Sequence, residues 1–193
     1  TPPDETILRY AQRYALHDHG DRPCRRTDRG PVWPPGAGLA VRRAALHASG
    51  WIDHGILVGR CGRQVTSGED TELVCRIRHA GFEVWYNPAM ELRHYIPRGR
   101  ISVEYLCRLM RGNGQIEPVP ELLAANVPAT ASVRLRQLAR STRRMAGILL
   151  ATLGRDWLQL HRMSADHRVE FACRSGRLRG ALDLLLHGYP GAR

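Results

Sequence analysis

The chain has 193 residues, a length that fits one ordinary domain or a part of a larger one. Hydrophobic residues make up 43% of it, enough to bury a core, and the formal net charge is +11 without a single lysine. This charge favours an anionic partner such as a nucleotide, a nucleic acid or a lipid headgroup, because arginine binds phosphate through two parallel hydrogen bonds. A coding bias toward arginine would produce the same excess, so the charge alone does not identify the partner.

Cysteine usage and hydropathy argue against a disulfide-rich protein, a cysteine zinc site and a membrane-spanning helix. The five cysteines are scattered and include no Cys-x-x-Cys pair, which disfavours a disulfide framework or a cysteine zinc site and favours the reducing cytoplasm. The longest apolar run, residues 145–153, is much shorter than the roughly 20 residues of a spanning helix. Because the chain begins at Thr1 and not at a methionine, we expect it to be part of a longer protein.

The first third of the chain is predicted to hold few regular elements. A helical pattern covers residues 7–16, and aspartate, glycine and proline residues then interrupt any element. Residues 39–41 are predicted to form a short strand, and residues 43–49 a short helix that stops at Gly50. Residues 51–66 contain few apolar side chains and are expected to form a mobile loop.

The middle of the chain has the clearest helix. Ser67 is suited to cap it, Asp70 follows three residues later, apolar side chains recur at helical spacing, and Gly81 ends it. Alternating apolar side chains then predict one strand over residues 82–86 and a second over residues 90–94.

The C-terminal half is predicted to be helical. Residues 102–111 form a helix that the run Gly112-Asn113-Gly114 is expected to end. From about residue 131 onward, arginines alternate with apolar residues at helical spacing.

Glu69 and Asp70 are the candidate catalytic residues. Acidic side chains in a first helical turn are stabilised by the exposed amides there, so one interpretation of this pair is purely structural. In the alternative interpretation, Asp70 removes the proton of an acceptor hydroxyl while Glu69 holds the acceptor or orients Asp70.

The other candidate residues each have a structural alternative. His94 is either a histidine at the edge of the core or a metal ligand, for which imidazole suits Mn²⁺ better than Mg²⁺. Trp51 is either a packing aromatic or a platform for a sugar. Arg108 and Arg111, one helical turn apart, form either a solvated face or a clamp for a diphosphate. A further candidate substrate-binding segment, which is otherwise a plain turn after two prolines, is Gly36-Ala37-Gly38.

Several of these segments together resemble the family 2 glycosyltransferases, which are inverting enzymes of the GT-A fold. The similarity spans roughly residues 31–115. The matching residues, in order, are Gly36-Ala37-Gly38-Leu39-Ala40-Val41-Arg42-Arg43-Ala44-Ala45-Leu46, Gly50-Trp51-Ile52-Asp53, Ser67-Gly68-Glu69-Asp70-Thr71-Glu72-Leu73, Arg76, Ala80-Gly81-Phe82, Asn87-Pro88 and Arg93-His94-Tyr95-Ile96-Pro97.

The resemblance implies an α/β fold, namely the C-terminal half of a Rossmann-like sheet domain followed by a helical tail. Residues 1–117 would be the acceptor-side part of a GT-A domain, and residues 118–193 an Arg-rich helical tail. It implies transfer of a sugar from a nucleotide-sugar to a glycan or lipid-linked hydroxyl, with Asp70 as the base. His94 would help to bind a divalent metal, Mn²⁺ or Mg²⁺, whose other ligands we expect from a missing N-terminal half.

One departure from the family pattern shapes this expectation. The family places nucleotide-binding strands and an Asp-x-Asp motif before the Gly-Ala-Gly segment, whereas only about 35 residues precede Gly36 and they show no such pattern. We therefore expect a fragment that is inactive on its own. The alternative is a basic helical module for an anionic membrane surface or nucleic acid. We expect that the chain does not bind nucleic acid. Attachment to the inner face of the membrane is compatible with the transferase function.

Overall fold

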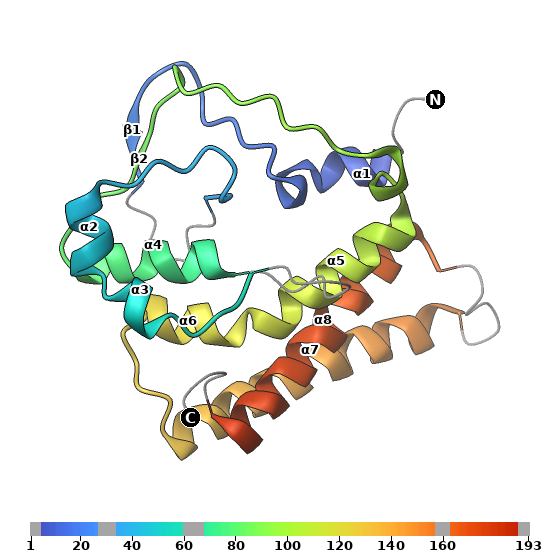
Figure 1. Cartoon of the computed structure of the whole chain (residues 1–193). Helices are drawn as coiled ribbons and strands as arrows, with labels where there is room; N and C mark the ends of the chain where they lie inside the picture. The colour runs from blue at the N-terminus through green and yellow to red at the C-terminus, as the bar shows by residue number, and fades with distance from the viewer. Residues whose placement is uncertain (1–4, 27–33, 60–67, 157–162, 189–193) are drawn as a thin grey trace.

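The protein is mostly helical in the computed structural model, which describes residues 5–26, 34–59, 68–156 and 163–188 (Figure 1). Two short strands, β1 (Cys24–Arg25) and β2 (Trp85–Tyr86), form the sheet of this described part. The helices are α1 (Glu5–Arg9), η1 (Ala11–Tyr14), α2 (Arg43–Ala48), α3 (Trp51–His54), α4 (Glu69–His79), η2 (Arg98–Arg100), α5 (Val103–Ile116), α6 (Pro118–Ala124), α7 (Ala131–Asp156) and α8 (Ala165–His187).

The expected α/β fold is wrong for the part of the chain that the structure describes. β1 and β2 pair antiparallel, with Cys24 opposite Tyr86, and they are two residues long. Residues 39–41 and 90–94, predicted as strands, are irregular. Their apolar side chains alternate as strands require, but backbone groups need a neighbouring strand as hydrogen-bond partner, and the described chain places none beside them. A Rossmann-like half-domain is therefore absent from the described residues.

α4 confirms the predicted helix between residue 67 and Gly81. Its first turn carries Glu69, Asp70 and Glu72 and its last turn is basic, so both ends are charged in the sense that the helix dipole favours. Gly68 begins it with a φ of 142°, and Gly81 follows its end with a φ of 86°. The predicted cap Ser67 lies outside the described residues.

α2 and α3 lie against α4 and share a small core with it. Gly50, at which the first of these helices was predicted to stop, takes the left-handed conformation with a φ of 62°. The expected mobile loop begins instead with α3, and the rest of that segment lies outside the described residues beyond Gly59. The buried residues Ala45, Leu73 and Ile77 join the three segments.

α5 and α8 form the closest helix pair of the structure. A Cβ at Gly176 would lie 2.0 Å from the carbonyl oxygen of Arg111, and one at Gly180 would lie 1.8 Å from that of Gln115. A Cβ at Gly114 would meet the Cys173 oxygen at 2.2 Å. The run Gly112-Asn113-Gly114, predicted to end α5, is thus inside it, and Gly114 lets the backbone of α8 approach.

α7 is the outer layer of the C-terminal helices, because it packs on α8 and α8 packs in turn on α5 (Figure 1). α7 and α8 confirm the predicted helical character beyond residue 131 for the residues that the structure describes there. Arg177, which is only 3% exposed, pairs with Glu117 and Glu121 and so ties α8 to α6. Among the described helices, none combines the length and hydropathy needed to cross a bilayer.

Candidate functional site

The carboxylate of Asp70 joins two segments of the glycosyltransferase-like pattern that are 34 residues apart. Its Oδ2 accepts a hydrogen bond from the backbone N–H of Gly36 at 2.9 Å, and its Oδ1 accepts one from the N–H of Thr71 at 2.7 Å. The residue is half-buried. The Thr71 hydroxyl also lies 3.4 Å from Oδ1, so Oδ2 is the oxygen with a second lone pair that can accept a proton from a substrate hydroxyl.

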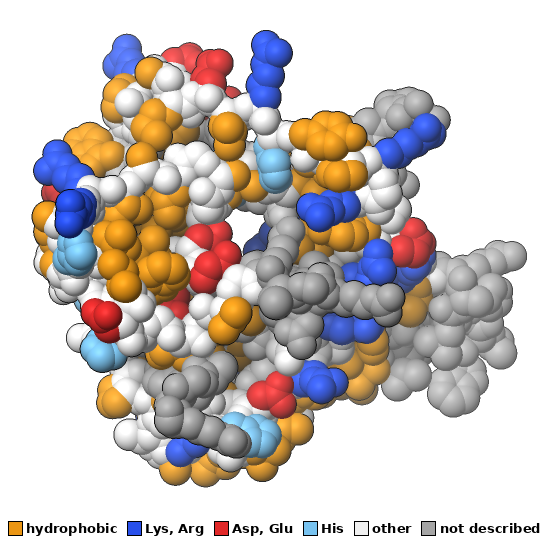
Figure 2. Space-filling model, viewed as in Figure 1, with side chains coloured by type: hydrophobic (Ala, Val, Ile, Leu, Met, Phe, Trp, Pro, Cys, Tyr) orange, Lys and Arg blue, Asp and Glu red, His pale blue; other side chains and the backbone are white. Residues whose placement is uncertain are grey.

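Glu69 lies beside it at the first position of α4. Its Oε2 accepts from the N–H of Gly68 at 2.8 Å, and a Cβ on Gly59 would lie 3.1 Å from its carboxylate. The side chain is half-buried, as Asp70 is. Figure 2 shows acidic side chains at the edge of a hollow in the molecular surface, at the place where α4 begins. Glu69 and Asp70 thus lie at an accessible helix start, which we call the carboxylate site.

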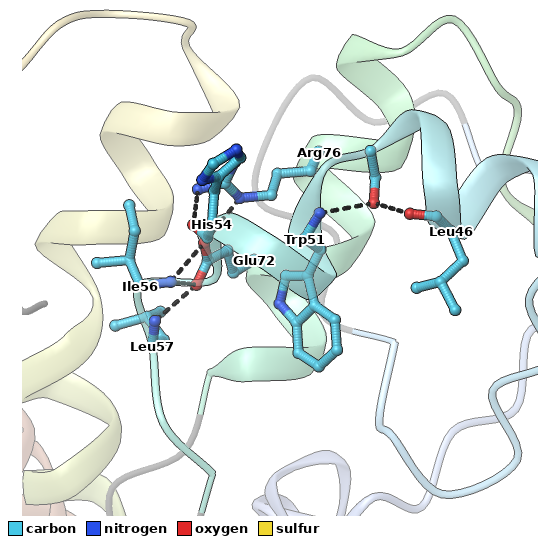
Figure 3. A network of polar contacts seen from close by, with 8 residues as sticks. Leu46, Trp51, His54, Ile56, Leu57, Glu72 and Arg76 are labelled. Atoms are coloured by element: carbon cyan, nitrogen blue, oxygen red, sulfur yellow. Dashed lines mark hydrogen bonds and ion pairs between the residues drawn. The ribbon is translucent and has the colours of Figure 1, made fainter.

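Glu72, the third acidic residue of that turn, is completely buried. Its carboxylate accepts from the N–H groups of Ile56 at 2.9 Å and Leu57 at 2.6 Å, and from Nε of Arg76 at 2.7 Å. Figure 3 shows this network, in which Arg76 also donates to the carbonyl of His54 at 2.7 Å. Sequence reasoning missed this role, although a glutamate four residues before an arginine is a recognisable pairing signal.

Trp51 packs in the core. It is half-buried against the cluster that α2 and α4 share, and its indole Nε1 is buried without a partner among the described residues. The N–H of its backbone is held by the Ser49 hydroxyl at 3.2 Å (Figure 3). This placement favours the packing role of Trp51 over that of a sugar platform.

His94 lies in a second place, against the N-terminal segment. Its Nδ1 is 2.9 Å from the carbonyl oxygen of Tyr14, so Nδ1 carries the proton and Nε2 is the atom that remains for a ligand. The segment that carries it passes the glycine turn near the carboxylate site, since a Cβ on Gly38 would lie 3.9 Å from Leu92. His94 therefore donates from one ring nitrogen to a carbonyl, as metal-binding histidines do, but the residues around it are not those of the carboxylate site.

His94 lies in a small pocket of about 60 Å³, which we call the basic pocket. His94, Arg13, Arg100 and Tyr105 help to line it, and none of the described lining residues is acidic. Burial raises the pKa of Tyr14, also in the wall, to about 12, so its phenol stays neutral and donates to the carbonyl of Arg100 at 3.0 Å. Two guanidinium groups beside an imidazole suit an anion better than a bare cation.

Arg108 and Arg111 differ in their surroundings. The guanidinium of Arg108 lies 5.7 Å from the centre of the Tyr105 ring, and that of Arg100 lies 5.9 Å from the same ring, so Arg108 belongs to the border of the basic pocket. Arg111 is exposed on α5, and its carbonyl oxygen faces Gly176. Arg108 thus borders the pocket together with Arg100, an arginine that the sequence did not single out, and the diphosphate clamp of Arg108 and Arg111 stays a prediction.

Two further features of the described residues concern metal binding and the cysteines. His, Cys, Asp and Glu side chains do not gather there in any group of three that would hold a metal ion, so His94 as a metal ligand stays a prediction. Burial raises the pKa of the Cys75 and Cys107 thiols, and raises that of Cys173 to about 11. These three thiols are therefore protonated at neutral pH and are poor nucleophiles.

Comparison with known proteins found no match to this chain among protein families, curated proteins or solved structures.

Proposed function

We propose that this chain provides the acceptor side of an inverting glycosyltransferase that moves a sugar from a nucleotide-sugar to a hydroxyl group. The observation that carries the proposal is the hydrogen bond between Asp70 Oδ2 and the N–H of Gly36, 2.9 Å long. It joins the Gly-Ala-Gly segment, which in family 2 glycosyltransferases lies beside the acceptor and the donor sugar, to the segment that carries the catalytic base in that family. The half-buried carboxylate is fixed by two backbone N–H groups and is available to a substrate hydroxyl.

In the proposed reaction the acceptor oxygen attacks the anomeric carbon of the sugar. The bond between that carbon and the phosphate oxygen breaks, and the nucleoside diphosphate leaves with the bonding electrons. Asp70 takes the proton of the acceptor hydroxyl as the new bond forms. A divalent cation, if bound, would add Lewis-acid stabilisation of the leaving group.

The test is Asp70→Asn in the complete gene product that carries this chain. We expect nucleoside diphosphate release from UDP-, GDP- and dTDP-sugars in the presence of hydroxyl acceptors to fall about 10²–10⁴-fold, the usual contribution of a general base. Asp21→Asn changes an exposed aspartate in the same way and is expected to leave the rate unchanged. Circular dichroism of each variant verifies that it is folded.

Two outcomes would contradict the proposal. One is an Asp70→Asn protein that keeps the rate of the unchanged enzyme. The other is an unchanged protein that neither binds nor turns over any of the nucleotide-sugars, with Mn²⁺ and Mg²⁺ each supplied.

A further inference from the structure

The outward face of α7 plays no part in the carboxylate site or the basic pocket. α7 turns a buried side toward α8, and the residues on that side are Val133, Gln137, Ser141 and Ile148. α8 lies between α7 and α5. Among the described elements, α8 is the main one that packs on α7, and it covers one side of that helix. The solvent-facing side of a surface helix in a globular protein is normally polar, with charges of both signs.

Three arginines form one strip along this outward face. Arg136, Arg140 and Arg143 follow one another at the spacing of a helical turn. All three are exposed, and none of their side chains makes an ion pair or a hydrogen bond with a described residue. α7 contains no aspartate or glutamate before Asp156, so the strip is not neutralised from within its own helix.

An apolar strip runs directly beside the arginines. Leu135, Leu149 and Leu150 are 54%, 43% and 68% exposed. Ala139 and Ala146 continue the strip between them at helical spacing and are also exposed. The outward face of α7 is therefore itself divided lengthwise into a basic and an apolar half, which water-exposed helices do not need.

We propose that α7 is a docking helix that lies flat on an anionic lipid bilayer. The arginine strip matches the phosphate groups of anionic headgroups in charge, and the leucines can enter the boundary between headgroups and acyl chains. Nucleic acid would use the arginines but would leave the leucine strip exposed to water, because phosphate contacts need no apolar side chains. The proposal does not depend on the transferase reaction, and its test has no activity readout.

The experiment measures flotation of the full chain with vesicles of phosphatidylcholine alone and with vesicles that also contain phosphatidylglycerol. We expect binding to the anionic vesicles only, and weaker binding as salt increases. The double variant Arg140→Gln/Arg143→Gln should bind roughly 25-fold more weakly, or about five-fold for each arginine. Leu149→Ser/Leu150→Ser should also lower binding at least about five-fold while leaving its salt dependence in place.

The matched control is Arg22→Gln/Arg42→Gln, which removes the same charge from exposed arginines near β1 and α2. It should bind anionic vesicles as the unchanged protein does, and an equal loss in both double variants would show that only net charge matters. Binding to random-sequence DNA that is lost in the α7 arginine variant but unaffected by the leucine variant would overturn the proposal in favour of nucleic acid. Equal binding to neutral and anionic vesicles, or none to either, would also overturn it.

Discussion

Three acidic residues in the first turn of α4 share one local cause and have three different environments. Glu69, Asp70 and Glu72 all favour a helix start, because the amides and the dipole there attract negative charge. Asp70 accepts a hydrogen bond from the N–H of Gly36, and Glu69 accepts one from the N–H of Gly68. Glu72 is completely buried. The carboxylate best placed for chemistry is a half-buried one, and the fully buried one is structural.

Glu72→Gln is expected to destabilise the protein by about 2–4 kcal/mol. The substitution removes the charge that balances Arg76 and weakens the bonds to two backbone N–H groups in a site without water access. The free energy of unfolding in urea measures the effect.

Glu170→Gln is the matched control for that substitution. Glu170 pairs with Arg174 at 2.7 Å in the same i, i+4 geometry as Glu72 with Arg76, but its side chain is 44% exposed. We expect a loss below about 0.5 kcal/mol there. Equal losses at the two positions would show that burial of Glu72 is not what stabilises α4.

At the scale of elements, the contact between α5 and α8 depends on residues that lack a side chain. Gly114, Gly176 and Gly180 lie where the two helix backbones are too close for a Cβ. Glycine in a helix interior costs about 1 kcal/mol relative to alanine. Its presence at three positions indicates that the van der Waals contacts between the two close backbones stabilise the protein by more than this cost.

A pair of identical substitutions separates packing from helix propensity. Gly180→Ala places a Cβ 1.8 Å from a backbone oxygen and should destabilise the protein by about 2–4 kcal/mol. Gly147→Ala, on the exposed side of α7, meets nothing closer than 3.8 Å and should stabilise it by up to about 1 kcal/mol. Thermal unfolding of both variants gives the sign, and a stabilising Gly180→Ala would contradict the close packing described here.

On the scale of the whole molecule, helices distant in the sequence meet around one cluster of buried side chains. Ile7 from α1 and Tyr14 from η1 share it with Leu106 from α5 and Val169 from α8. An exposed ion pair between Arg9 and Asp166, 2.6 Å long, connects the same segments. The N-terminal segment thus stabilises the C-terminal helices, and in the same place it provides the Tyr14 carbonyl to His94.

A double-mutant cycle tests this connection. Ile7→Ala should cost about 2–4 kcal/mol and Val169→Ala about 2 kcal/mol, since each leaves a cavity in the same cluster. We expect their combined effect to differ from the sum by at least about 0.5 kcal/mol. Ile7→Ala combined with Ile77→Ala, which belongs to another cluster, should be additive, and the reverse result would mean that the clusters are wrongly assigned.

Helices were predictable from the sequence because their causes are local. Periodic apolar residues, acidic first turns and glycines at the ends act within a few residues, and α2, α4 and α8 follow these signals. The predicted strands were less reliable, since a strand exists only if another segment pairs with it. Residues 82–86 contain the two-residue strand β2, whereas residues 39–41 and 90–94 form none. Gly114 was misread as a helix end because the partner that needs a glycine there, α8, lies some 60 residues away.

For the candidate site, the sequence by itself determined which residue types stand together at the start of α4 and that the chain carries a large positive charge. Only the tertiary structure decided that Asp70 faces Gly36, that Glu72 is sealed, that His94 lies among arginines, and that α7 exposes a divided face. The physical reason is the same in each case. The order of residues sets what a side chain can do, whereas its solvent exposure and its partners are set by segments that reach it from elsewhere in the fold.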